Sequence, residues 1–157
     1  MNEESVFHVR AIEHHETQVL RHRILWPHKA ASHECTIDID QAAHAHHVGA
    51  FNPQGHHVGV CSLFAQRSER YPSVLPLGES VYRLRVMGTL PEVRGQGAGA
   101  AIIEYACDWC RKEGASWLWC DAREVAFDFY EKVGFSFVSE PYEVAQIGPH
   151  RMMARKL

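Results

Sequence analysis

The sequence predicts an α/β fold: a single domain with a mixed central β-sheet flanked by helices on both faces. The length of 157 residues suits one compact domain, so we expect a single domain over residues 1–157. Hydrophobic residues make up 46% of the chain and charged residues 22%, which is typical of a protein with a substantial core. In the second half, strand and helix patterns alternate, as they do where helices connect the strands of one sheet.

The first half begins with a predicted strand at residues 6–10 ("VFHVR") and a predicted helix at residues 13–23. The Trp26–Pro27 pair ends that helix, because a residue before proline avoids the helical region. Residues 28–43 have no periodic pattern, and we expect them to be irregular.

Two apolar runs around the turn "NPQG", residues 52–55, predict a β-hairpin. The cross-strand pairs that we expect are Phe51–His56, His47–Val60 and His57–Ala50. The histidine clusters at 44–47 and 56–57 leave a metal site open as an alternative. In this register the histidines are spread along the strands, so we expect them to face solvent or a cleft and to bind no metal.

A polar loop at residues 66–78 follows the hairpin. Gly114 and Gly134 stand where two helices are expected to end. The predicted strands are 80–90, 116–120, 135–139 and 151–157, and the predicted helices are one that ends near Glu113 and one over 125–133.

The stretch "LPEVRGQGAGAAIIEYACDWC", residues 90–110, places three glycines after an arginine and before an amphipathic helix. The first turn of a helix presents N–H groups without intrahelical partners, and the helix dipole adds partial positive charge. Glycines let a ligand approach this backbone closely, and Arg94 adds a full positive charge. The stretch therefore predicts a site for a phosphate or a pyrophosphate.

Two common nucleotide-binding motifs do not fit this stretch. The chain has no Gly-Lys-Ser/Thr for a Walker A loop, and the dinucleotide motif G-x-G-x-x-G, counted from Gly97, requires glycine where Ile102 stands. The pattern that fits is Arg-x-x-Gly-x-Gly after a strand. "GTLPEVRGQGAG" (88–99) and "AFDFYEKVGF" (126–135) resemble, at matching separation, the pyrophosphate loop and a later helix of the GNAT superfamily of acyl-CoA-dependent N-acyltransferases.

The resemblance implies an N-acetyltransferase with acetyl-CoA as cosubstrate and direct transfer to a primary amine. In this family, the strand that ends at residues 87–89 binds the pantetheine arm through its backbone, and the following loop binds the pyrophosphate. The implied cofactor-binding residues are Met87, Gly88, Thr89, Arg94, Gly95, Gln96, Gly97, Ala98, Gly99, Arg123, Ala126 and Tyr130.

Tyr130 matches the position where many family members carry a tyrosine near the CoA sulfur. The resemblance therefore implies Tyr130 as the acid that protonates the departing thiolate, and the alternative is an aromatic side chain that only packs. Arg123 departs from the family, which often has asparagine or a similar amide there. Arginine donates hydrogen bonds but accepts none, so Arg123 would lose part of the pantetheine contact while it could reach a CoA phosphate.

Several side chains are candidates for the base that deprotonates the acceptor ammonium, and ordered water without a dedicated base is a further alternative. We favour His150 as the catalytic base, because the stretch before the last strand is expected to border the acceptor cleft. The other candidates are Glu79, Glu92, Asp121 and His47. The acceptor is expected to be a small-molecule or peptide amine.

The formal net charge of −3 predicts neither a nucleic-acid partner nor a membrane partner. Five scattered cysteines predict reduced thiols in the cytoplasm, and the Cys107–Cys110 pair inside a predicted helix favours packing over redox or zinc chemistry. The acidic N-terminus lacks the apolar segment of a secretory signal. A homodimer is left open, and so is a non-catalytic CoA- or metal-responsive binding module on the same fold.

Overall fold

The computed structural model describes residues 6–157, so residues 1–5, on which part of the N-terminal prediction falls, lie outside it. The chain divides into two compact units. The first unit contains Met1–Phe64 and Val86–Ala106, and the second contains Ala65–Arg85 and Cys107–Leu157. Strand β4 (Val81–Thr89) and helix α2 (Ala98–Lys112) contribute residues to both units.

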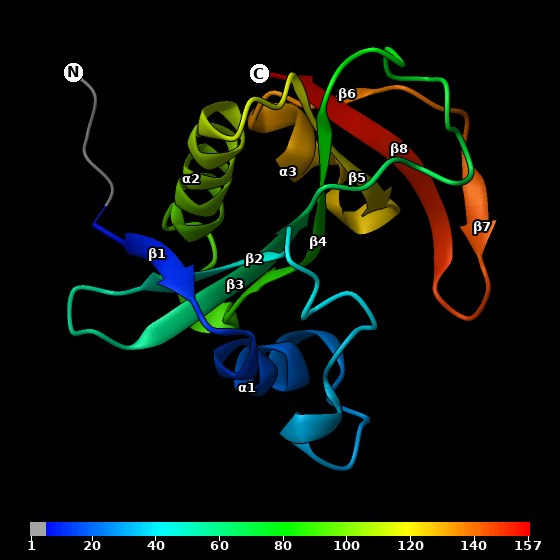
Figure 1. Ribbon diagram of the computed structural model, residues 1–157. Helices are drawn as coiled ribbons and strands as arrows, with labels where there is room; N and C mark the ends of the chain where they lie inside the picture. The colour runs from blue at the N-terminus through cyan, green and yellow to red at the C-terminus, as the bar shows by residue number, and fades with distance from the viewer. Residues whose placement is uncertain (1–5) are drawn as a thin grey trace. The chain divides into compact units, whose positions relative to one another are not determined.

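The sheet of the first unit has the strand order β1-β2-β3-β4. Strand β1 (His8–Ile12) pairs antiparallel with β2 (His46–Phe51), which pairs antiparallel with β3 (His57–Phe64), as Figure 1 shows. The inner residues of β2 and β3 are buried on both faces, which explains their continuous apolar runs. The core of this unit contains Phe7, Ile12, Leu20, Val58, Val60, Leu90, Val93 and Ala98.

Helical segments cover both faces of this sheet. A Cβ atom built on Gly59 would lie 2.8 Å from Ile102 Cδ1 in α2 and 3.4 Å from Thr89 Cγ2. A Cβ atom built on Gly88 would instead lie 2.6 Å from Ile24 Cγ2. Because neighbouring residues of a strand point to opposite faces, α2 and the N-terminal helical segment lie on opposite sides, as predicted (Figure 1).

The helix predicted at 13–23 is confirmed in extent but not in type. It begins as the 3₁₀ turn η1 (His14–Thr17), continues as α1 (Gln18–Leu20) and ends as the π turn η2 (Arg21–Leu25). The Trp26 amide closes the π turn by donating to the Arg21 carbonyl at 2.9 Å, and the segment ends before Pro27 as predicted. The following irregular stretch contains one short 3₁₀ turn, η3 (Ser32–Glu34).

A buried polar cluster, defined by Arg21, Asp40, His47 and Ser62, ties the π turn to the sheet. The guanidinium of Arg21 is fully buried and donates to the two carboxylate oxygens of Asp40 at 2.7 and 2.8 Å. It also donates to Ser62 Oγ at 3.0 Å, and that hydroxyl lies 2.7 Å from His47 Nδ1. The other ring nitrogen of His47 lies 2.8 Å from the Asp40 carbonyl oxygen. The cluster thereby connects η2, the 35–40 loop, β2 and β3.

The predicted register of the β2–β3 hairpin is wrong. The observed pairs are Phe51–His57, Ala50–Gly59 and His47–Ser62, with the register shifted between Ala50 and Phe51. The reason lies in the turn, where the Asn52 amide donates to the His56 carbonyl at 2.9 Å and Val58 becomes an extra, bulged residue. His47 is also buried, at 6% exposure, instead of facing solvent or a cleft, and its two ring nitrogens lie within hydrogen-bonding distance of Ser62 Oγ and the Asp40 carbonyl.

The free energy of unfolding is expected to fall as the pH drops below about 6.5, the ordinary pKa of histidine. Burial lowers the pKa of the His47 imidazole, so the unfolded chain takes up a proton before the folded protein does. Stability should then decrease by up to about 1.4 kcal/mol per pH unit for this group, until the lower folded-state pKa is reached. Urea unfolding between about pH 7.5 and about pH 5.5 measures the slope. The His47→Gln variant should show a shallower slope, and an unchanged slope would contradict the assignment.

The second unit contains the order β4-β5-β8-β6, with β7 paired to β8. Strand β5 (Trp117–Arg123) runs parallel to β4 and antiparallel to β8 (Gly148–Lys156), so the sheet is mixed. Strands β6 (Ser136–Phe137) and β7 (Tyr142–Val144) pair antiparallel with β8. Strand β7 was not predicted, because three residues between polar turns are too few to show a period. The core contains Leu75, Val81, Trp119, Met152 and Ala154.

The ends of the helices in the second unit follow the predicted glycines. Gly114 has a positive φ of 84°, and the Ala115 amide donates to the Cys110 carbonyl at 3.0 Å, which closes α2. Helix α3 (Phe127–Lys132) follows the 3₁₀ turn η5 (Glu124–Ala126) and ends before Gly134, whose φ is 95°. All five cysteines lie within the described residues as buried thiols outside any disulfide bond, and the burial of Cys107 and Cys110 agrees with the packing interpretation. Within residues 6–157, no helix has the length and apolar character needed to cross a membrane.

Candidate functional site

The end of β4 carries a strained residue beside the segment predicted to bind pantetheine. Val86 has a φ of 48°, in the left-handed region that a β-branched side chain rarely adopts. Such strain costs about 1–3 kcal/mol and gathers at functional sites. The following residues Met87, Gly88 and Thr89 are half-buried in their strand. Nothing in the sequence signals this positive φ, because valine favours extended backbone.

The predicted phosphate loop connects the 3₁₀ turn η4 (Pro91–Val93) to α2. Gly95 and Gly97 have φ values of 79° and 95°, and a Cβ atom on either would meet no atom within 4 Å. Backbone conformation, not crowding by the protein, therefore requires glycine at both positions. Residues 94–97 are exposed, and the Gln96 side chain donates to the Glu92 carbonyl at 3.0 Å.

The first turn of α2 presents its amides beside this loop. The Ala101 amide donates to the Gly97 carbonyl at 3.0 Å, which is a bond from residue i to residue i−4. The amides of residues 98–100 lie before this bond, in the first turn of the helix. Arg94 stands exposed at the same end of the helix. Within the first unit, the structure thus brings the predicted residues 94–99 together in an open turn of N–H groups with one guanidinium, which suits an anion.

Tyr130 lies in α3 of the second unit, almost buried at 9% exposure. Its ring packs against Phe129 and Phe135, with centroid distances of 5.2 and 5.3 Å. Burial raises the pKa of the Cys120 thiol, and a hydrogen bond with the Tyr130 side chain acts in the opposite direction. The phenol therefore lies against the thiol of β5. Arg123 and Ala126 stand at the end of β5 and in η5, with Arg123 exposed.

His150 is buried at 6% exposure near the start of β8. In the sheet it is paired with Arg123 of β5 on one side and with Tyr142 of β7 on the other. Its Nδ1 lies 2.9 Å from the Gly148 carbonyl oxygen, which favours the tautomer with the proton on Nδ1 and a free electron pair on Nε2. The ring of Tyr142 stacks on the imidazole at a centroid distance of 6.1 Å.

The other candidate bases are each engaged by a protein partner. Glu79 accepts from Trp117 Nε1 at 2.8 Å, and exposed Glu92 lies 3.7 Å from Arg23. Asp121 accepts from Arg83 at 2.7 Å through one oxygen and from the Tyr142 hydroxyl through the other. His47, in the buried polar cluster, uses both ring nitrogens. Among the described residues, no three histidine, cysteine, aspartate or glutamate side chains are placed to hold a metal ion.

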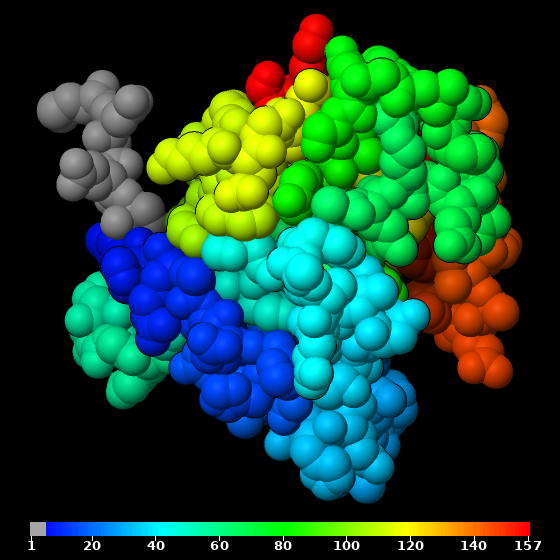
Figure 2. All heavy atoms as spheres, in the orientation of Figure 1, coloured from blue at the N-terminus to red at the C-terminus, as the bar shows by residue number. Residues whose placement is uncertain are grey.

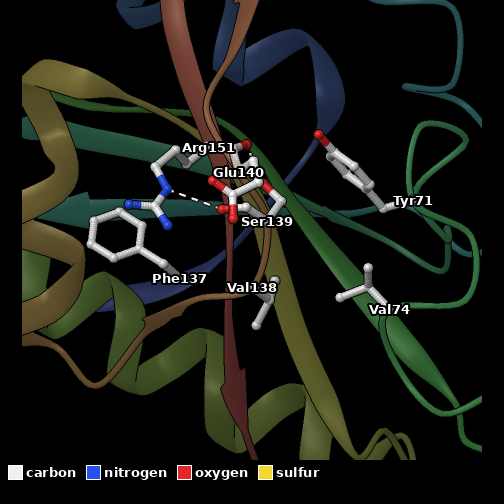
Figure 3. Close-up of a pocket in the computed structure, with 7 residues that line it drawn as sticks. All are labelled: Tyr71, Val74, Phe137, Val138, Ser139, Glu140 and Arg151. Carbon is white, nitrogen blue, oxygen red and sulfur yellow. Dashed lines mark hydrogen bonds between the residues drawn. The ribbon is translucent and has the colours of Figure 1, made fainter.

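A hollow of about 410 Å³ opens in the second unit (Figure 3). Arg151 closes one side, where its Nε donates to the Ser139 carbonyl at 3.0 Å and its guanidinium lies 3.9 Å from the Phe137 ring centroid. Tyr71 lines the other side, and its ring centroid lies 5.8 Å from that of Tyr142. Figure 2 shows the loop at residues 66–78 (green), which carries Tyr71, beside the β7 region (orange). The lining residues are Tyr71, Val74, Phe137, Val138, Ser139, Glu140 and Arg151.

Solved structures with a similar fold include N-acetyltransferases. A putative N-acetyltransferase from Lactobacillus plantarum is similar with a TM-score of 0.74 and 16% identity, over 98% of this chain and 99% of that one. An aminoglycoside 6'-N-acetyltransferase complexed with coenzyme A is similar with a TM-score of 0.68 and 14% identity, over 95% of this chain and 96% of that one. The fold is therefore that of this class of transferases.

The model of the Acetyltransferase (GNAT) family matches residues 10–135. The uncharacterized N-acetyltransferase YitI of Bacillus subtilis (strain 168) is 33% identical over 149 residues, which are 95% of each chain. The chain belongs to the acetyltransferase (GNAT) family. The predicted family, fold class and N-acyltransferase activity are confirmed.

Proposed function

We propose that this enzyme transfers an acetyl group from acetyl-CoA directly to a primary amine, and that residues 1–157 act as one transferase domain. The observation that carries the proposal is the exposed turn of amides at the start of α2 beside Arg94. Its geometry suits a pyrophosphate. The complex of the structurally similar aminoglycoside 6'-N-acetyltransferase with coenzyme A supports the choice of ligand.

The cofactor is held by two segments of the first unit. The loop amides and the Arg94 guanidinium bind the pyrophosphate. The positive φ values of Gly95 and Gly97 orient the loop amides toward it. The backbone of Met87–Thr89 binds the pantetheine arm and donates to the thioester oxygen, which polarises the carbonyl. The loop residues in this role are Arg94, Gly95, Gln96, Gly97, Ala98 and Gly99.

We assign proton transfer to His150 and Tyr130. His150 Nε2 removes a proton from the acceptor ammonium, and the neutral amine attacks the thioester carbonyl carbon. The C–N bond forms and the C–S bond breaks, and the Tyr130 hydroxyl protonates the departing thiolate. The acceptor nitrogen gives up its second proton to solvent, and the Tyr130 phenolate takes a proton back from solvent. Arg123 and Ala126 complete the cofactor contacts, with Arg123 directed to a CoA phosphate. The acceptor is a small-molecule or peptide amine.

An amine library tests the function directly. Purified protein is incubated with acetyl-CoA and each amine, in the presence of EDTA, and released CoA is measured. Release with one or a few amines supports the proposal. Absence of release with every amine, together with no thermal shift from acetyl-CoA, would contradict the proposal and leave the metal-responsive module as the alternative.

Replacement of Arg94 by alanine is expected to raise the KM for acetyl-CoA about tenfold with little change in kcat, because a charge-assisted contact to the pyrophosphate is lost at an exposed site. Initial rates at varied acetyl-CoA measure the effect. Arg111→Ala removes the same charge at the other end of α2, where Arg111 pairs with Asp108, and serves as control. A KM equal to that of the control would argue against a phosphate contact by Arg94.

A further inference from the structure

The contact between Gly88 and Ile24 closes one face of β4. Ile24 Cγ2 would lie 2.6 Å from a Cβ atom at position 88, and Leu25 Cδ2 would lie 3.5 Å from it. A contact under 3 Å is shorter than real side chains tolerate, so Ile24 already occupies the volume that any side chain at position 88 would need. The missing side chain of Gly88 is thus replaced by one from the π turn.

The opposite face of the same strand is also closed. Thr89 points to the side on which Ile102 of α2 packs over Gly59. Ile102 is fully buried in the interior, whereas Ile24 is half-buried at the border of the core. A shorter side chain at position 24 would therefore enlarge the space beside Gly88 without creating a cavity at the centre of the first unit.

The π turn holds Ile24 in place. Arg21, the first residue of that turn, is anchored by two bonds to Asp40 and one to Ser62. The bond from the Trp26 amide to the Arg21 carbonyl closes the turn around Ile24. A side chain held on both sides in this way does not swing away to admit a larger group.

We propose that Ile24 limits the acyl group that this enzyme transfers to two carbons. The inference rests on the proposed function, in which the backbone at Met87 binds the thioester oxygen. The inference includes the placement of the acyl chain, which leaves the carbonyl carbon next to this backbone, on the side of β4 where Ile24 packs against Gly88. An acetyl methyl group fits beside the strand, and the further methylenes of a butyryl group meet Ile24 and Leu25.

Isothermal titration calorimetry with CoA, acetyl-CoA and butyryl-CoA tests the inference without knowledge of the acceptor. The parent protein should bind butyryl-CoA about tenfold or more weakly than acetyl-CoA, and Ile24→Ala should bring the two Kd values close together. Val19→Ala, at a 56% exposed position of the same helical segment, should keep the preference of the parent. The ratio of two Kd values in one variant does not depend on the fraction of folded protein.

A second variant refills the space from the other side. In the Ile24→Ala/Gly88→Ala double variant, the new methyl group at position 88 takes back part of the volume, so the preference for acetyl-CoA should partly return. Tight binding of CoA with equal Kd values for acetyl-CoA and butyryl-CoA in the parent would overturn the inference alone. An unchanged ratio in folded Ile24→Ala would do the same. Binding of none of the three would overturn the proposed function, and this inference with it.

Discussion

Replacement of Tyr130 by phenylalanine is expected to lower kcat about 100-fold or more, because the departing thiolate loses its proton donor. The ring remains between Phe129 and Phe135, so packing is kept and only the hydroxyl is removed. The loss of the hydrogen bond to Cys120 should cost about 1 kcal/mol of stability. Steady-state rates of CoA release with an amine that the enzyme accepts give kcat. Repeating them over a range of pH shows whether the rate falls at high pH, as it does when a general acid loses its proton.

The matched control for this variant is Tyr105→Phe. It also removes one phenol hydroxyl, which lies 2.9 Å from His46 Nε2 in the first unit. Its kcat should equal that of the parent. If Tyr130→Phe retained the parent kcat and its pH profile, Tyr130 would be an aromatic residue of the core and the proton would come from solvent.

Replacement of Asp40 by asparagine is expected to lower the free energy of unfolding by about 3–5 kcal/mol, because it leaves the buried Arg21 charge without a counter-charge. Burial alone would raise the pKa of the Asp40 carboxyl, but the bonds from Arg21 and from the Ile37 amide hold it below its ordinary value. The carboxylate is therefore charged at neutral pH. Urea unfolding followed by circular dichroism measures the loss.

Ser62→Ala is the control for the buried polar cluster. It removes a neutral partner of Arg21 and of His47 but keeps the charge pair, so its cost should be about 1–2 kcal/mol. A loss below about 1 kcal/mol for Asp40→Asn would mean that water or another group neutralises Arg21. Because η2 carries Ile24, any folded Asp40→Asn protein should also lose part of its preference for acetyl-CoA.

Local patterns in the sequence were sufficient for most of the secondary structure and for the family. The glycines at 114 and 134 follow the helices that they were predicted to end, since a positive φ is a property of the residue itself. The glycine-rich loop after a strand predicted a phosphate ligand, because the anion-binding capacity of a helix start depends on a few adjacent residues. The same loop carried the resemblance to the family. The short strand β7 was missed, since its pairing with β8 is its main stabilising interaction.

By itself, then, the sequence determined the α/β class and the order of nearly all its elements, and it predicted a cofactor loop whose residues are contiguous in the chain. Only the tertiary structure decided the hairpin register, the burial of His47, the positive φ of Val86 and the contact of Ile24 with Gly88. Each of these depends on residues far apart in the chain. Their energies come from packing and from buried hydrogen bonds that form once the strands and the π turn meet, and no local propensity contains them.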